Sequence, residues 1–326
     1  MIYNQIPNSL AIPSHASFVI RAFSKEDVIE AVALAEKEGL PLIPLGDGTN
    51  IVPQSEVKAV VLLLDLKGIE INGEIFKIAA GENWDDVVKL SVEKGFRGLE
   101  ALSAIPGRAG AAPIQNIGAY GSEIGTVIER VEVLDRTKKE FVYLSKEECQ
   151  FGYRTSLFKK NPDDFIVISI ELRLSKAKPK MPDYKDVKKY FSDRENTSPN
   201  LQEIREAIIE IRKNKLPDPK LIPNAGSFFT NPIVDREILS KFPEMPNFPF
   251  ENKLKIPAGW LIEQTGFKGA KIGQIEIYKN NALVLTNPNR ANFNDVISAQ
   301  NTIQKAVFDK FGVLLEKEPR IIYEHL

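Results

Sequence analysis

The sequence is poor in the residues that most often ligate metals or act as nucleophiles and bases. Its 326 residues include one cysteine, Cys149, and two histidines, His15 and His325. One cysteine excludes an intramolecular disulfide and a cysteine cluster for zinc or iron–sulfur, and two histidines at opposite ends disfavour metal and triad chemistry. We therefore expect no metal, and any catalysis must use carboxylates, hydroxyls, Lys, Arg or a bound cofactor.

Charge of one sign and long apolar runs are also missing. With 43 Lys+Arg and 44 Asp+Glu the formal net charge is −1, which disfavours bulk binding of nucleic acid. The longest unbroken apolar run is Ala59 to Leu64, far below the roughly 20 residues that span a bilayer. The first residues lack the basic start and hydrophobic stretch of a secretory signal. We expect a cytoplasmic protein without nucleic-acid or membrane partners.

The first third of the chain mixes helix and strand patterns. Ser24 and Asp27 form a capping-box pattern that opens a helix ending at Gly39. A strand is predicted over 40–45, followed by a glycine turn, and Pro53 opposes an immediate helix there. The strand–turn–helix of a dinucleotide-binding Rossmann unit is therefore missing.

The rest of the chain continues this mixture, which predicts an α+β protein. A tight hairpin turn is expected at Asn72-Gly73, and a polar stretch over 176–199 is typical of a linker or a mobile surface loop. The other expected strands cover 58–66, 127–135, 140–144 and 164–174, and a strand pair lies within 271–287. Two further helices are expected over 84–94 and 294–311. Another is expected to open at Ser198-Pro199, with an apolar stripe of Leu201, Ile204, Ile208 and Ile211.

Two glycine-rich segments could approach a ligand closely. In GDGTN, Gly46 to Asn50, successive N–H groups and two polar side chains could face a diphosphate, although an ordinary strand-to-loop turn would have the same composition. IPGRAGAAPIQNIGAYG, 105–121, offers small side chains beside the amides of Gln115 and Asn116, although a tightly packed structural loop is the alternative. Together the two segments favour a dinucleotide held between two subdomains.

Three further motifs carry polar side chains suited to catalysis. Arg154 in FGYRTSLFK could bind a carboxylate in a bidentate fork, or lie at the surface stacked on Tyr153. Ser227 in NAGSFFTNP has no G-x-S-x-G elbow and no histidine base, so it is interpreted as a proton or hydrogen-bond donor, with a plain turn serine as the alternative. In LLEKEPRIIY, period two places Glu318 and Arg320 on one face, and an exposed charged edge strand is the alternative.

Seven motifs in order resemble those of the UDP-N-acetylenolpyruvoylglucosamine reductases, the MurB flavoenzymes of peptidoglycan precursor synthesis. The resemblance runs from about Pro41 to Arg320 and includes KLPDP and a tyrosine-bearing insertion, as in the longer family type. The motifs are GDGTN, IPGRAGAAPIQNIGAYG, FGYRTSLFK, KLPDP, NAGSFFTNP, AGWLIEQ with its following KG, and LEKEPR. Seven ordered motifs are much more specific than a lone glycine pattern.

The resemblance implies a two-subdomain FAD-binding fold of the vanillyl-alcohol-oxidase (PCMH) kind plus a C-terminal α+β substrate-binding domain. The implied bounds are 1–65, completed by 314–326, for the first FAD-binding subdomain, 66–200 for the second, and 201–313 for the substrate-binding domain. Some relatives in that wider fold tether flavin through His or Cys, but neither occurs in these segments, so the FAD is expected to be noncovalent. The implied FAD-binding residues are Gly46, Asp47, Gly48, Thr49, Asn50, Gly107, Ile114, Gln115, Asn116, Gly118, Ala119, Tyr120, Ile168 and Arg320.

The implied reaction is reduction of the enolpyruvyl group of the sugar nucleotide to give UDP-N-acetylmuramate. NADPH reduces the flavin, hydride then passes from flavin N5 to the β-carbon of the substrate, and Ser227 delivers a proton to the α-carbon. By motif match, Arg154 and Glu318 act at the carboxyl group. Lys215, Asn231 and Gln264 match positions that contact substrate or nicotinamide nucleotide, and Tyr184 resembles the tyrosine that folds over the uridine side.

Two other functions remain open at this point. Another FAD oxidoreductase of the same fold would act on a different substrate, and a flavin or nucleotide-sugar binding protein would keep the scaffold without turnover. We expect a monomer with a small-molecule substrate.

The sequence departs from the family pattern at three positions. Thr49 stands where the family often has serine, Pro319 follows Glu318 where a β-branched residue is usual, and Asp47 adds a negative charge beside the expected diphosphate.

Overall fold

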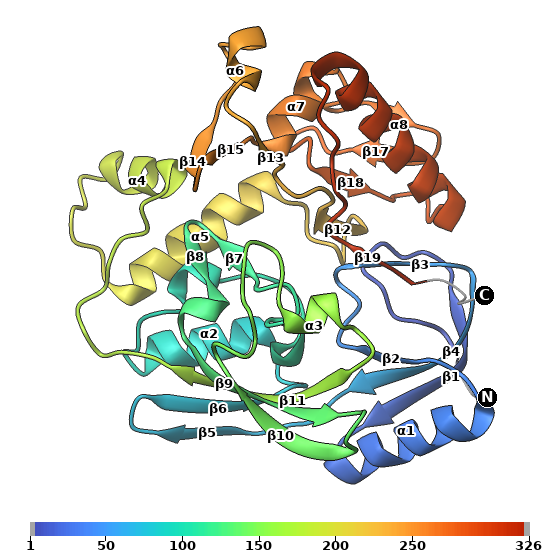
Figure 1. Ribbon diagram of the computed structural model, residues 1–326. Coiled ribbons are helices and arrows are strands. Elements are labelled where there is room, and N and C mark those ends of the chain that lie inside the picture. The colour runs from blue at the N-terminus through green and yellow to red at the C-terminus, as the bar shows by residue number, and fades with distance from the viewer. Residues whose placement is uncertain (1–3, 323–326) are drawn as a thin grey trace. The chain divides into compact units, whose positions relative to one another are not determined.

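The computed structural model describes residues 4–322, which divide into two compact units (Figure 1). Within these residues, the first unit comprises Asn4 with 16–47 and 58–213, and the second comprises 5–15, 48–57 and 214–322. Helices and strands occur in both units, so the predicted α+β class is confirmed. The GDGTN motif spans a boundary between the two units.

A small sheet with one helix forms part of the first unit. Its strand order is β1-β4-β2, with β2 and β4 parallel. The bounds are β1 (His15–Ala22), α1 (Lys25–Glu38), β2 (Leu42–Leu45) and β4 (Glu56–Leu64). Ser24 caps α1 in the predicted capping box, and Gly39 ends the helix with φ 64°. Val28, Ala31 and Ala35 pack against this sheet in one buried cluster.

The larger sheet of the first unit is antiparallel, in the order β10-β9-β11-β6-β5. Its strands are β5 (Ile69–Asn72), β6 (Ile75–Ala79), β9 (Ile128–Asp135), β10 (Glu140–Ser145) and β11 (Phe165–Arg173). The hairpin β5–β6 is confirmed, but Asn72 pairs with Ile75, so the two turn residues are Gly73 and Glu74 rather than Asn72 and Gly73. Gly73 has φ 61°, which suits the first turn position.

Short helices complete the first unit. Those that pack on or link the larger sheet are α2 (Trp84–Glu93), η1 (Glu100–Leu102), η2 (Ala109–Ala111), η3 (Ile124–Thr126) and α3 (Leu157–Lys160), with the strand pair β7 (Gly118–Ala119) and β8 (Ser122–Glu123). Figure 1 shows α2 along one face of the sheet, and its Trp84, Val87 and Val88 are buried there.

The polar stretch 176–199 is not only a linker. It contains α4 (Lys185–Ser192), which packs against α5 (Leu201–Lys215) through Val187 and Phe191. The polar composition hid this helix because only one narrow side of it is apolar. The stripe predicted on α5 is confirmed, since its four members are all buried.

The second unit contains three small sheets. A four-stranded sheet has the order β12-β18-β17-β16, a three-stranded one β13-β15-β14, and β19 pairs with β3 in parallel. The strands are β3 (Ile51–Pro53), β12 (Asn224–Ser227), β13 (Ile233–Val234), β14 (Phe248–Phe250), β15 (Lys253–Lys255), β16 (Lys271–Ile272), β17 (Ile275–Ile277), β18 (Val284–Thr286) and β19 (Arg320–Ile322). The strand pair expected within 271–287 is confirmed as β17 with β18.

Three helices accompany these sheets, namely α6 (Ile238–Lys241), α7 (Ala258–Gln264) and α8 (Phe293–Phe311). The predicted long helix is α8, which Gly312 ends with φ 68°. The strand expected in LLEKEPRIIY is shorter than its pattern, because β19 begins only at Arg320. Leu315 is fully buried whereas Lys317 is exposed, although a regular strand would place these two residues on the same face.

Candidate functional site

The two glycine-rich segments meet within the first unit. Gly46 follows β2, and a Cβ atom added to it would lie 3.1 Å from Cγ of Arg108 and 3.8 Å from Cβ of Ala111. The start of the GDGTN turn therefore packs directly on the second segment. Asp47 strengthens this contact, because its Oδ1 accepts a hydrogen bond of 2.6 Å from Nε of Arg108.

The second half of the GDGTN turn lies in the second unit and needs its glycine. Gly48 has φ 66°, and a Cβ there would come within 1.9 Å of the carbonyl oxygen of Pro7. The N–H of Ser9 donates to the carbonyl of Gly48 at 3.1 Å, and its hydroxyl donates to that of Thr49 at 3.2 Å. The N–H of Arg320 donates to the carbonyl of Asn50 at 3.0 Å, which brings the last motif beside the turn.

The second segment is held to the turn between β6 and α2 by main-chain hydrogen bonds. The N–H of Ala109 donates to Glu82 at 2.8 Å, that of Gly110 donates to Ala80 at 2.9 Å, and the carbonyl of Gly107 accepts from Trp84 at 3.0 Å. A Cβ on Gly110 would approach Cβ of Ala80 to 2.5 Å. Close packing, which was the alternative explanation, therefore accounts for this glycine.

Asn116 is a buried hub of the same segment. Only 1% of its surface is exposed, and its φ is 49°. Its Nδ2 donates to Oε2 of Glu123 at 2.8 Å and to the carbonyl of Gly152 at 3.0 Å, while its Oδ1 accepts from the N–H of Gly125 at 2.8 Å. Its amide group is thus engaged within the protein, and a cofactor beside this residue would meet its main chain.

Arg154 occupies a tight turn beside the glycine segment. Gly152 and Thr155 exchange two main-chain hydrogen bonds around it, and Arg154 has φ 53°, a conformation that non-glycine residues rarely adopt. Its Nη2 donates to the carbonyl of Gly118 at 2.9 Å. Its Cζ lies 5.5 Å from the centre of the Tyr153 ring, so the stacking foreseen as the alternative also occurs.

Tyr184 packs on the end of the glycine segment. Its ring meets that of Tyr120 edge to face, with 5.2 Å between centroids, and 43% of Tyr184 is exposed. Burial raises the pKa of Tyr120 to about 12, against the opposing effect of Arg212, with which it is hydrogen-bonded. Nε of Arg212 donates to the carbonyl of Ala104 at 3.2 Å, so α5 is tied to this cluster.

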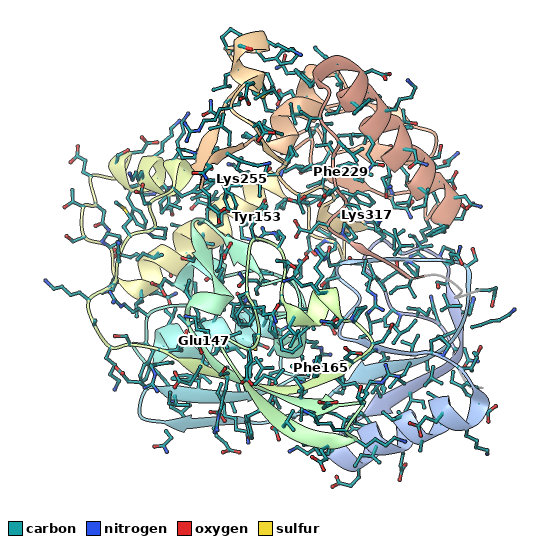
Figure 2. The ribbon with its side chains drawn as sticks, in the orientation of Figure 1. Glu147, Tyr153, Phe165, Phe229, Lys255 and Lys317 are labelled. Atoms are coloured by element: carbon teal, nitrogen blue, oxygen red, sulfur yellow. The ribbon has the colours of Figure 1, made fainter. Side chains whose placement is uncertain are left out.

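Ser227 and Glu318 come from distant segments that pair in the second unit. The N–H of Glu318 donates to the carbonyl of Phe228 at 2.9 Å, and Figure 2 shows the neighbouring pair, Phe229 and Lys317, side by side. Glu318 thus lies across from the residue that follows Ser227. Phe228 and Phe229 are almost fully buried and anchor the segment that carries Ser227.

Asn224 is a buried residue in the strand of Ser227 that the sequence analysis did not single out. It is 3% exposed, and its Nδ2 donates to the carbonyls of Pro217 at 3.1 Å and Ile222 at 2.8 Å. Its Oδ1 accepts from the N–H of Gly226 at 2.9 Å. Asn224 therefore ties the KLPDP motif to the strand of Ser227. The available signal was its place as first residue of NAGSFFTNP, but nothing local indicated which groups it would bind.

The remaining substrate candidates of the second unit lie at helix ends. Lys215 is the last residue of α5 and opens KLPDP. Oδ1 of Asn231 accepts from the N–H of Ala258, the first residue of α7, at 2.9 Å. Gln264 ends α7, and its carbonyl accepts from Nζ of Lys310 at 2.5 Å.

The other cofactor candidates belong to the first unit. Ile168 is 2% exposed in β11, where its carbonyl accepts from Ala80, and the carbonyl of Ile114 accepts from the hydroxyl of Ser156 at 2.5 Å. Gln115 follows Ile114, and Ala119 lies in β7. The first unit thus gathers Arg154, Tyr184 and most cofactor candidates; the second gathers the candidates Gly48, Thr49, Asn50, Lys215, Ser227, Asn231, Gln264, Glu318 and Arg320.

These residues fit a dinucleotide better than a metal. The two glycine-rich segments touch one another at Gly46, and glycine turns of this kind can present main-chain N–H groups to the phosphates of a dinucleotide. Among the described residues no group of three His, Cys, Asp or Glu side chains could hold a metal ion. The helices of residues 4–322 include none that is long and apolar enough to cross a membrane.

Comparison with known proteins also indicates an FAD-binding protein, and its matches extend over nearly the whole chain. The model of an FAD-binding domain matches residues 16–140, and that of the C-terminal domain of UDP-N-acetylenolpyruvoylglucosamine reductase matches residues 218–322. The reductase of that name from Pseudomonas aeruginosa is 39% identical over 324 residues, covering 96% of both chains. That of Escherichia coli K12 is 38% identical, covering 97% of this chain and 94% of its own.

A solved structure agrees on the fold. The crystal structure of the MurB reductase from Thermus caldophilus aligns with 96% of this chain and 95% of its own, with a TM-score of 0.69 at 22% identity. The predicted FAD-binding fold with a C-terminal domain is therefore confirmed. The chain belongs to the UDP-N-acetylenolpyruvoylglucosamine reductase (MurB) family.

Proposed function

We propose that this protein is an FAD-containing, NADPH-dependent reductase that converts UDP-N-acetylenolpyruvoylglucosamine to UDP-N-acetylmuramate for peptidoglycan synthesis. The observation that carries the proposal is identity of 39% with a reductase of that name over 96% of both chains. The ordered motifs support it, because the chain retains all three of Arg154, Ser227 and Glu318. Another FAD oxidoreductase of the same fold would have no use for all three.

Bound FAD would supply the hydride, which it takes from NADPH and passes to the β-carbon of the enolpyruvyl group. The protein must then stabilise negative charge that moves into the substrate carboxyl group. We assign this to the guanidinium of Arg154 and to Glu318, whose carboxyl group must be protonated or hydrogen-bonded so that it assists. The tight turn supports the role of Arg154, since it holds the residue in one unusual conformation.

Ser227 is assigned as the proton donor to the α-carbon. A serine hydroxyl is a weak acid, so its oxygen needs neighbouring donors as the proton leaves. The pairing of Phe228 with Glu318 supports this role because it brings a second polar group to the strand of Ser227. Asn224 supports it further by fixing the main chain of Gly226, the residue before Ser227.

The cofactor and substrate are assigned to the motif residues. The main chain of Gly46 to Asn50 would hold the FAD diphosphate, and Gly107 to Tyr120, with Ile168 and Arg320, would line the cofactor. Lys215, Asn231 and Gln264 would contact the substrate or NADPH, and Tyr184 would cover the uridine. Cys149 is fully buried and burial raises its pKa to about 12, which suppresses the reactive thiolate and supports noncovalent FAD.

The same proposal includes the organisation and setting of the protein. The two FAD-binding subdomains would cover 1–65 with 314–326 and 66–200, and the substrate-binding domain would cover 201–313, a division that differs from the two compact units at 5–15, 48–57, 201–213 and 314–322. We also propose a cytoplasmic monomer whose only partners are small molecules. Its net charge of −1 supports the absence of a nucleic-acid partner.

Stopped-flow absorbance without oxygen tests the activity. We expect a yellow protein whose flavin absorbance bleaches with NADPH and recovers only when the enolpyruvyl sugar nucleotide is added. Recovery with other unsaturated acids instead would favour a different oxidoreductase. Bound flavin that NADPH never bleaches would favour a binding protein, and protein that takes up no FAD would contradict the proposal.

The Ser227→Ala variant tests the proton donor. Bleaching by NADPH should keep nearly its parental rate, because no substrate carbon is protonated in that half-reaction. Recovery with the enolpyruvyl substrate should slow by roughly 10²- to 10⁴-fold, the usual contribution of a general acid. Equal slowing of both half-reactions would contradict the assignment.

A further inference from the structure

Two carboxylates meet at the end of the parallel strands in the first unit. In β2 and β4, Leu45 pairs with Leu63 in parallel register. Asp47 follows Leu45 by the same interval as Asp65 follows Leu63, so the register brings Asp47 and Asp65 to the same edge. Neighbouring strands are about 5 Å apart, and at that separation two carboxylates repel one another.

Arg108 lies between these carboxylates. Its Nε is 2.6 Å from Oδ1 of Asp47, its Nη2 is 3.2 Å from Oδ1 of Asp65, and its Nη1 donates to the carbonyl of Gly81 at 2.7 Å. Arg21 binds the other oxygen of Asp65. The cluster is therefore balanced, with two arginines and two carboxylates. Three of its side chains are partly shielded from solvent, with 22% of Arg108, 36% of Asp47 and 13% of Asp65 exposed, whereas 57% of the Arg21 side chain is exposed.

The main chain around Arg108 is fixed separately. Arg108 forms a β-bridge with Asn83, and the two residues after it bond to the same turn between β6 and α2. The Arg108 side chain is therefore what reaches from the second glycine-rich segment to the first. Gly46 allows this approach, because a Cβ there would lie 3.1 Å from Cγ of Arg108.

We propose that Arg108 is a positioning residue for FAD, which neutralises Asp47 and keeps its carboxylate turned away from the cofactor. The inference rests on the proposed function, in which the turn beginning at Gly46 takes the diphosphate. Asp47 then has a new role. Its carboxylate holds Arg108, and only its main chain faces the cofactor, so the negative charge at this position no longer opposes FAD binding.

Charge variants of the full chain test this inference through the Kd of FAD, measured by equilibrium dialysis. Arg108→Gln leaves Asp47 uncompensated beside the diphosphate and should raise the Kd about 30-fold, which equals about 2 kcal/mol. Arg108→Lys keeps the charge without the fork and should raise it about 5-fold. Asp47→Asn removes the repelling group and should change the Kd by less than about 3-fold.

The double variant Asp47→Asn/Arg108→Gln distinguishes charge from packing. It leaves neither charge unpaired at this position, so its Kd should return to within about 5-fold of the parental value. The defect of Arg108→Gln should also shrink as salt is raised, because screening weakens the repulsion by Asp47. If Arg108→Gln does not fold, the Arg108→Lys and double variants decide the question by the same values.

Arg173→Gln is the matched control. It breaks an exposed bidentate pair with Glu129 in the same unit and should leave the Kd of FAD unchanged. Equal weakening by Asp47→Asn and Arg108→Gln, with no recovery in the double variant, would overturn the inference. Unchanged binding by all the variants would also overturn it while leaving the proposed function intact, whereas parental protein that binds no FAD would refute the proposed function itself.

Discussion

Replacing Asn224 by alanine should destabilise the second unit more than any ordinary surface change. The side chain is 3% exposed and makes three hydrogen bonds, two donated to the carbonyls of Pro217 and Ile222 and one accepted from the N–H of Gly226. A net hydrogen bond contributes about 1 kcal/mol, and a buried partner left unsatisfied costs about 1–3 kcal/mol. The free energy of unfolding should therefore fall by roughly 3 kcal/mol.

Thermal unfolding measures this loss. At roughly 2–4 °C per kcal/mol, the Tm should fall by about 6–12 °C. Asn281→Ala is the matched control, because within residues 4–322 the side chain of Asn281 accepts one local hydrogen bond, from the N–H of Leu283 to its Oδ1 at 3.1 Å. That variant should lose about 1 kcal/mol or less.

The two variants should also differ in the flavin half-reactions. Because Asn224 links KLPDP to the strand of Ser227, Asn224→Ala should slow recovery of the flavin by substrate more than bleaching by NADPH. A difference of 1 kcal/mol shifts the Tm by at least about 2 °C. If the Tm of Asn224→Ala lies within about 2 °C of the Tm of Asn281→Ala, the energetic reasoning is refuted. Intact recovery kinetics would refute the link to the site.

Three further predictions concern the first unit. Arg205→Gln should lower the free energy of unfolding by about 2 kcal/mol, measured by urea titration. It breaks a bidentate pair with Asp85 at 2.7 Å and leaves that carboxylate with the N–H of Ala104, at 2.6 Å, but without its cation. Burial alone would raise the pKa of Asp85, but its hydrogen bonds with Arg205 lower this pKa overall. The ionised Asp85 therefore stabilises the fold above about pH 4, and this stabilisation is lost as the pH falls further. Acid titration of the Asp85→Asn variant should not show this loss. Tyr184→Ala should raise the KM for the sugar nucleotide about 10-fold, which corresponds to a loss of about 1.4 kcal/mol, and should leave the KM for NADPH nearly unchanged. Equal changes in the two KM values would contradict the place of Tyr184 over the uridine.

The sequence was sufficient where structure depends on neighbouring residues. The capping box at Ser24, the end of α1 at Gly39 and the apolar stripe of α5 were all predicted, because each requires only residues within a few positions. The polar stretch around α4 was misjudged, since that helix is stable only when its narrow apolar side packs on α5.

The family and its motifs could also be identified from the sequence, because the order of seven short segments is itself a linear property. The partners of the motif side chains could not. Arg108 reaches Asp47 and Asp65 across 61 and 43 positions. The main-chain N–H of Glu318 donates to Phe228, 90 residues earlier. Such contacts depend on strand register and on the close approach of distant main chains, which only the folded chain determines.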